Sequence, residues 1–100
     1  ITLTDASTIT WDASKGYNAT VTITSTGRAL TITNPIAGEY YSIKVIQGSG
    51  GSKTITTYPT GTIWVNGITP TLSVTAARTD IITFYYDGTN YFANYALNYF

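Results

Sequence analysis

The chain has 100 residues, of which 43% are hydrophobic and 10% are charged, and its five basic and five acidic side chains give no net charge. A neutral chain without a basic cluster excludes nucleic acid as a partner, and no apolar run approaches the ~18 residues that span a membrane. Cysteine and histidine are absent, which excludes disulfides, thiolate metal sites, imidazole bases and thiol nucleophiles.

The length predicts a single domain over residues 1–100. Because the chain starts at Ile1 rather than Met, we expect a processed product or a fragment of a longer protein. Alternation of β-branched and polar residues predicts strands in its first half. In the longest of them, Tyr41, Ile43 and Val45 face inward and Tyr40 faces outward. The predicted strands of this half are residues 2–4, 8–11, 19–24, 30–32 and 39–47.

The second half continues the same pattern. Gly48 to Ser52 is predicted to be a hairpin tip, because a strand follows it at hairpin distance. The predicted strands are residues 53–57, 62–65, 71–74, 80–86 and 91–100. Short strands at turn spacings of roughly 8–12 residues predict an all-β fold, namely a two-sheet antiparallel β-sandwich that is jelly-roll-like. The absence of an internal repeat disfavours a solenoid.

The strongest local pattern is the hairpin around Asp87-Gly88, a dipeptide that favours tight reversal. Pairing Asp87 with Asn90 fixes the register of the two strands, and both faces of the ribbon then carry apolar or aromatic side chains. A strand pair in an isolated monomer normally has one polar face. We therefore expect a partner on the outer face. The predicted opposed pairs are Tyr86–Tyr91, Phe84–Ala93, Ile82–Tyr95, Tyr85–Phe92 and Ile81–Ala96.

The carboxylates offer little catalytic chemistry. Asp5, Asp12, Asp80 and Asp87 all lie at turns or strand ends, where Asp commonly binds the local backbone. A loop that superficially resembles an oxygen-ligand site begins at Asp12, but Lys15 in its middle opposes a cation. We therefore expect no enzymatic activity, no metal site and no cofactor.

The aromatic residues are the remaining candidates for function. For Trp11 and Trp64 a core position is favoured, because the chain has few Leu and no Met to fill a core. Exposed aromatic rings otherwise anchor protein interfaces or stack on sugar rings. The predicted subunit interface consists of Tyr85, Phe92, Ile81 and Tyr40, and the predicted glycan-stacking residues are Trp64 and Tyr58.

The order of these segments resembles a β-sandwich domain of bacteriophage virion proteins, found in tail fibres, receptor-binding proteins and head decorations. The resemblance covers almost the whole chain, and residues 80–91 are the closest part. Asn66-Gly67-Ile68 departs from it, because a glycine pair is more usual there. The segments that carry the resemblance are residues 8–12, 30–35, 38–41, 45–47, 51–56, 58–64 and 67–72, together with 80–91.

The resemblance implies a small domain, often a homotrimer, that builds or decorates a virion. We therefore expect a structural protein located in the virion, with copies of itself and other virion proteins as its partners. One alternative is a carbohydrate-binding module that recognises a host-surface glycan. A second alternative is an extracellular filament subunit assembled by strand donation, for which residues 1–4 and 95–100 are candidate donated strands.

Overall fold

The chain folds into two β-sheets in the computed structural model, which describes all residues from Ile1 to Phe100. The predicted β-rich fold is thereby confirmed. Two short 3-10 helices are the only helices, and neither is long and apolar enough to cross a membrane. The elements are β1 (Thr8–Asp12), η1 (Ala13–Lys15), β2 (Asn18–Ile23), β3 (Arg28–Thr33), β4 (Glu39–Gln47), β5 (Ile55–Thr57), β6 (Thr62–Trp64), η2 (Val65–Gly67), β7 (Thr79–Tyr86) and β8 (Tyr91–Tyr99).

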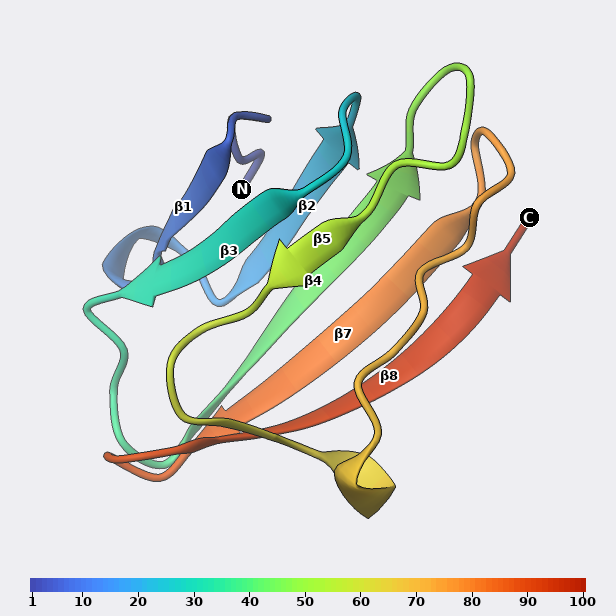
Figure 1. The fold of residues 1–100 in the computed structure, drawn as a ribbon. Coiled ribbons are helices and arrows are strands. Elements are labelled where there is room, and N and C mark those ends of the chain that lie inside the picture. The colour runs from blue at the N-terminus through green and yellow to red at the C-terminus, as the bar shows by residue number, and fades with distance from the viewer.

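The smaller sheet has the strand order β1-β3-β5 and the larger sheet has the order β2-β4-β7-β8-β6. Figure 1 shows the smaller sheet lying in front of one side of the larger one. Up to β5 the chain alternates between the sheets, so that β1, β3 and β5 stack in parallel, as do β2 and β4. Only β4–β7 and β7–β8 pair antiparallel, while β6 adds to β8 in parallel.

The prediction of a fully antiparallel fold was therefore wrong. Antiparallel neighbours arise when a tight turn returns the chain to the same sheet, whereas parallel neighbours need a longer crossover. Here each turn of the first half carries the chain into the opposite sheet. A strand therefore pairs with the strand that comes two places later in the sequence. The winding of residues 8–57 is consequently solenoid-like, although the sequence has no repeat to indicate it.

The segment from Gly48 to Ser52 is one of these crossovers rather than the predicted hairpin tip, because β4 and β5 belong to different sheets. The buried Gln47 side chain holds the crossover in place. Its Nε2 donates to the carbonyl oxygens of Lys53 at 2.8 Å and Ser73 at 2.7 Å, and its Oε1 accepts from the Lys53 amide at 3.0 Å. Residues 71–74, predicted as a strand, adopt irregular structure instead.

Both sheets contribute side chains to one hydrophobic core. Tyr41, Ile43 and Val45 face inward on β4 as predicted, and Tyr40 faces outward. Trp11 is fully buried, which confirms its predicted core position, and its indole Nε1 donates to the Gly16 carbonyl at 2.9 Å. The buried cluster comprises Leu3, Ile9, Trp11, Ala13, Ala19, Val21, Ile23, Leu30, Tyr41, Ile43, Val45, Ile55, Leu72, Ile82, Phe84, Tyr91 and Ala93.

The hairpin of β7 and β8 has the predicted register, including the opposed pairs Tyr86–Tyr91 and Tyr85–Phe92. The amide of Asp87 donates to the Asn90 carbonyl at 3.1 Å. Its carboxylate in turn accepts from the amides of Thr89 at 2.8 Å and Asn90 at 2.7 Å. These bonds fix the turn, and the turn fixes which side chains point away from the core.

Candidate functional site

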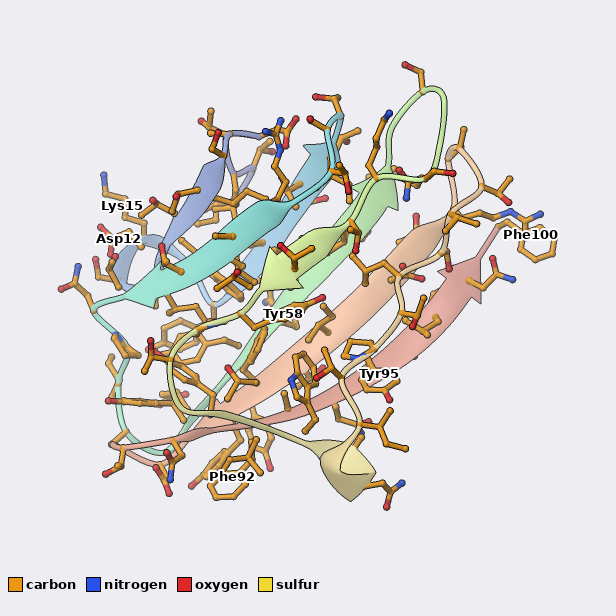
Figure 2. The ribbon with its side chains drawn as sticks, viewed as in Figure 1. Asp12, Lys15, Tyr58, Phe92, Tyr95 and Phe100 are labelled. Atoms are coloured by element: carbon orange, nitrogen blue, oxygen red, sulfur yellow. The ribbon has the colours of Figure 1, made fainter.

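A row of large side chains crosses the outer face of the larger sheet. Tyr40 on β4 is opposed to Tyr85 on β7, Tyr85 is opposed to Phe92 on β8, and Phe92 is opposed to Ile63 on β6. We call these four residues the aromatic row. Tyr40 is 65% exposed, Phe92 46% and Ile63 45%. In Figure 2 the ring of Phe92 stands clear of the ribbon at the hairpin end of the molecule.

The aromatic row borders a shallow groove of about 350 Å³. Trp64, Val65, Ala93 and Asn94 complete its lining. No charged side chain lies in the groove, and Asn94 is its only amide. Such a lining suits contact with another apolar surface, where rigid aromatic rings contribute most of the binding energy.

Three of the four predicted interface residues, namely Tyr40, Tyr85 and Phe92, thus lie side by side. Ile81 lies on the same outer face but farther along β7, between Lys44 and Ala96 and outside the groove. Interface formation by these residues stays a prediction.

Ile63 and Val65 belong to the same surface but were not predicted. Their strand was recognised from its alternation. Its neighbour was not, because β6 pairs directly with β8 although β7 lies between the two strands in the sequence. The signal in the sequence was the apolar pair Ile63 and Val65, which flanks Trp64 and so points to the opposite face of the strand.

The two predicted glycan-stacking residues lie against each other. The rings of Tyr58 and Trp64 are 4.8 Å apart at 83°, and Trp64 also lies 5.9 Å from the ring of Tyr95. Both residues are half-buried, and only Trp64 reaches the groove. The Tyr58 hydroxyl is buried without a hydrogen-bond partner. Burial, with a smaller effect of the Asp80 charge, raises the pKa of Tyr58 above its ordinary range.

The carboxylates are engaged within the chain, as expected for turn and strand-end residues. Asp5 forms a two-point ion pair with Arg28, with both N–O distances 2.9 Å. Burial alone would raise the pKa of Asp5, but hydrogen bonds from Arg28 and Thr24 outweigh it and hold that pKa below its ordinary value. No group of three or more potential metal-ligating side chains forms.

Asp12 and Asp80 illustrate the same structural use. Hydrogen bonds to Asp12 from Ser14 and then Asn34 lower its pKa; the bonds from Ser14 close the turn at η1, and the bond from Asn34 ties this turn to the end of β3. The buried Asp80 accepts from the Ser73 amide at 2.7 Å, the Ser73 hydroxyl at 2.6 Å and the Asn98 amide at 2.9 Å. It thereby ties residues 71–74 to β7 and β8.

The two chain ends, which are the candidate donated strands, are paired within their own chain. The Leu3 amide donates to the Thr20 carbonyl at 2.8 Å, and the Thr20 amide donates to the Ile1 carbonyl at 2.7 Å. At the other end, β8 pairs with β7 as far as Tyr99, and the Arg78 guanidinium lies 3.4 Å from the centre of the Phe100 ring. Beyond Ala93, the outer edge of β8 has no neighbouring strand.

Comparison with known proteins gives no relative: no family model, no curated protein and no solved structure matches the chain.

Proposed function

We propose that the chain is a non-enzymatic structural domain of a bacteriophage virion that self-associates through the aromatic row. The proposed fold is a two-layer β-sandwich. Its parallel strand pairs set it apart from a jelly roll, which is built from antiparallel Greek keys. The observation that carries the proposal is the row of four large, directly opposed side chains on an outer sheet face.

A second copy of the chain is the occupant that this surface suits best. The row and its groove contain no charge, and the chain has no net charge, so two copies can approach without long-range repulsion. Lys44 is the only charged side chain at an outward position of the five strands of the larger sheet, and it lies beyond the polar pair Ser42–Thr83. An apolar centre with a polar surround is the usual anatomy of a protein interface.

The number of copies and the setting follow from the resemblance. A homotrimer within a tail fibre, tail or head decoration is the arrangement that we propose, with other virion proteins as further partners. Four of the five acidic side chains are engaged in hydrogen bonds within the chain, one of them also in an ion pair, which supports a structural role for them.

Light scattering coupled to size-exclusion chromatography tests the proposal. We expect the wild-type chain to form an oligomer at micromolar concentration, and Tyr85→Lys and Phe92→Lys to convert it into a folded monomer. Thr22→Lys places the same charge on β2, at the other end of the same face, and serves as the matched control that stays oligomeric. A wild-type monomer, or an oligomer unaffected by either substitution, would refute association through the aromatic row.

A further inference from the structure

A second hollow lies at the hairpin end of the molecule, beside the open edge of β3. Because β5 pairs only with Arg28 and Ala29, the rest of β3 has no strand on that side. A pocket of about 400 Å³ occupies this position, between β3, the loop after β5 and the β7–β8 hairpin. Figure 1 shows the loop after β5 and the β7–β8 turn at the same end of the molecule. We call this pocket, which lies between β3, the loop after β5 and the β7–β8 hairpin, the hairpin-end pocket.

One wall of the pocket is a pair of tyrosines. Tyr86 and Tyr91 are opposed residues of the hairpin, and their rings lie 4.6 Å apart at 31°. The Tyr86 hydroxyl is held by the Gly88 carbonyl at 2.9 Å, which fixes the ring. Pro35 and Pro59 line the pocket as well. These rings are rigid and apolar, so a ligand with a flat apolar face can contact them at little entropic cost.

The Tyr91 hydroxyl is a second feature of the pocket that points to a ligand, and it is independent of the paired tyrosine rings. Tyr91 is only 6% exposed, yet its hydroxyl takes part in none of the side-chain hydrogen bonds of the structure, which involve the hydroxyls of Tyr41, Tyr86 and Tyr95. Burial, followed by the neighbouring phenols of Tyr86 and Tyr41, raises the pKa of Tyr91 to about 12. It is therefore a protonated donor at neutral pH, and buried polar groups normally have a partner.

This hydroxyl is not sealed inside the core. Among buried side-chain polar atoms without a hydrogen-bond partner, only the Tyr58 hydroxyl is fully enclosed. The Tyr91 hydroxyl has no partner within the chain and is not fully enclosed, and Tyr91 lines the pocket. A ligand that enters the pocket can thus accept a hydrogen bond that the chain itself leaves unused.

The rest of the lining defines the class of ligand. Thr31, Thr60 and Thr89 bring hydroxyl groups, and no charged side chain is present. The aromatic-row groove, by contrast, has an almost wholly apolar lining. Rings that stack, hydroxyls that donate and accept, and the absence of charge suit a neutral ligand with both an apolar face and hydroxyl groups.

We propose that the hairpin-end pocket binds a neutral saccharide, whose ring packs against the half-buried Tyr86 and whose hydroxyl accepts a hydrogen bond from Tyr91. A proline-rich peptide is the competing occupant of an aromatic-lined groove. The saccharide is favoured because the hydroxyls of Thr31, Thr60 and Thr89 line the pocket beside the rings, and a ligand rich in hydroxyl groups can use them. The site is separate from the aromatic row, and the proposal does not depend on self-association.

The experiment is a titration of the labelled full chain with the methyl glycosides of glucose, galactose, mannose and N-acetylglucosamine, followed by amide NMR shifts. We expect saturable shifts at Thr89 and Tyr91 with at least one glycoside. Tyr91→Phe removes only the hydroxyl and should weaken binding about threefold to tenfold, the effect of one neutral hydrogen bond. Tyr86→Ala should abolish binding, whereas Phe92→Ala, in the aromatic row, should leave it unchanged.

Thermal unfolding of the same variants is the control that shows whether each of them still folds. Since the Tyr91 hydroxyl has no partner within the chain, Tyr91→Phe should unfold at the wild-type temperature or above it. Absence of saturable shifts with all four glycosides, or shifts centred on Phe92, would overturn the proposal. Binding of a proline decapeptide at Thr89 and Tyr91 in place of the glycosides would overturn it too.

Discussion

Tyr40 and Tyr85 occupy opposed positions on β4 and β7, and their ring centroids lie 4.8 Å apart with the planes inclined at 54°. The two rings restrict each other while Tyr40 is still largely exposed to solvent. A surface of this kind is ordered before any partner arrives, which lowers the entropic cost of association.

The Tyr40–Tyr85 contact should be measurable in the isolated domain. Aromatic pairs contribute about 0.5–1.5 kcal/mol beyond their buried area. We expect Tyr40→Ala and Tyr85→Ala each to lower the free energy of unfolding. The sum of these two losses should exceed the loss measured for the double variant. Urea unfolding of the four proteins at a concentration where the chain is monomeric gives this coupling, and strict additivity would show that the rings do not interact.

Tyr58 carries a hydroxyl that stabilises nothing in the fold, because it is enclosed without a hydrogen-bond partner. An unpaired buried polar group costs about 1–3 kcal/mol. Tyr58→Phe should therefore raise the free energy of unfolding by about 1 kcal/mol, with the Tyr58–Trp64 ring contact retained. Loss of stability in chemical denaturation would mean that the hydroxyl has a partner in solution.

Gly50 and Gly51 form a matched pair within the crossover from β4 to β5. Both have positive φ, at 86° and 65°, so alanine is strained at either position. A Cβ at Gly51 would clash with the Val74 carbonyl oxygen, whereas a Cβ at Gly50 meets nothing within 4 Å. Gly51→Ala should be more destabilising than Gly50→Ala by about 1–3 kcal/mol, the usual cost of overpacking. Equal thermal shifts for the two variants would contradict this packing.

Asp80 is a buried carboxylate that holds an irregular segment onto the sheet. Asp80→Ala leaves the Ser73 and Asn98 amides without their acceptor, and should cost about 3 kcal/mol or more. Ser73→Ala removes only the hydroxyl donor and should cost about 1 kcal/mol. Denaturant unfolding tests the order of the two effects, and a reversed order would show that the carboxylate is dispensable.

The ion pair of Asp5 should make the stability of the fold sensitive to acid. The pKa of Asp5 in the folded chain lies below the ordinary value of 3.8, so the unfolded chain takes up a proton first as the pH falls. The stabilisation by Asp5 is therefore complete above about pH 5 and is lost as the pH falls through the lowered folded value.

Asp5→Asn should accordingly be less stable than wild type at neutral pH, and the difference should shrink towards about pH 2. Unfolding free energies measured across this range test the claim, with Asp12→Asn as a comparison, because Asp12 accepts hydrogen bonds but forms no ion pair. A difference between Asp5→Asn and wild type that stays constant with pH would contradict the proposed role of the Arg28 pair.

Local patterns predicted local structure well. The β7–β8 register followed from Asp87 and Asn90 alone, because a tight turn fixes the pairing of the strands that it joins. The inward positions of β2 and β4 followed from alternation, because the side-chain period of a strand is two residues. Three neighbouring members of the aromatic row were predicted on this basis.

Relations between distant segments were not predictable in the same way. The crossover at Gly48 to Ser52 is held by Gln47, whose partners Lys53 and Ser73 are recognisable only once the fold is known. The place of Ile63 beside Phe92 depends on a parallel pairing of β6 with β8, two strands that are separated in the sequence by β7. The pocket at Tyr91 likewise exists because β5 ends early, and strand ends are poorly determined by sequence.

The alternation of the chain between the sheets has a consequence for the order in which the fold is completed. Only β7 and β8 pair with a strand that directly follows or precedes them through a tight turn, and every other pairing closes a long loop. Such a topology refolds slowly, on a scale of about milliseconds to seconds. During synthesis β6 emerges before β8, the only strand with which it pairs. Ile63 and Trp64 can therefore take up their positions in the sheet only after β8, the last strand, has been made.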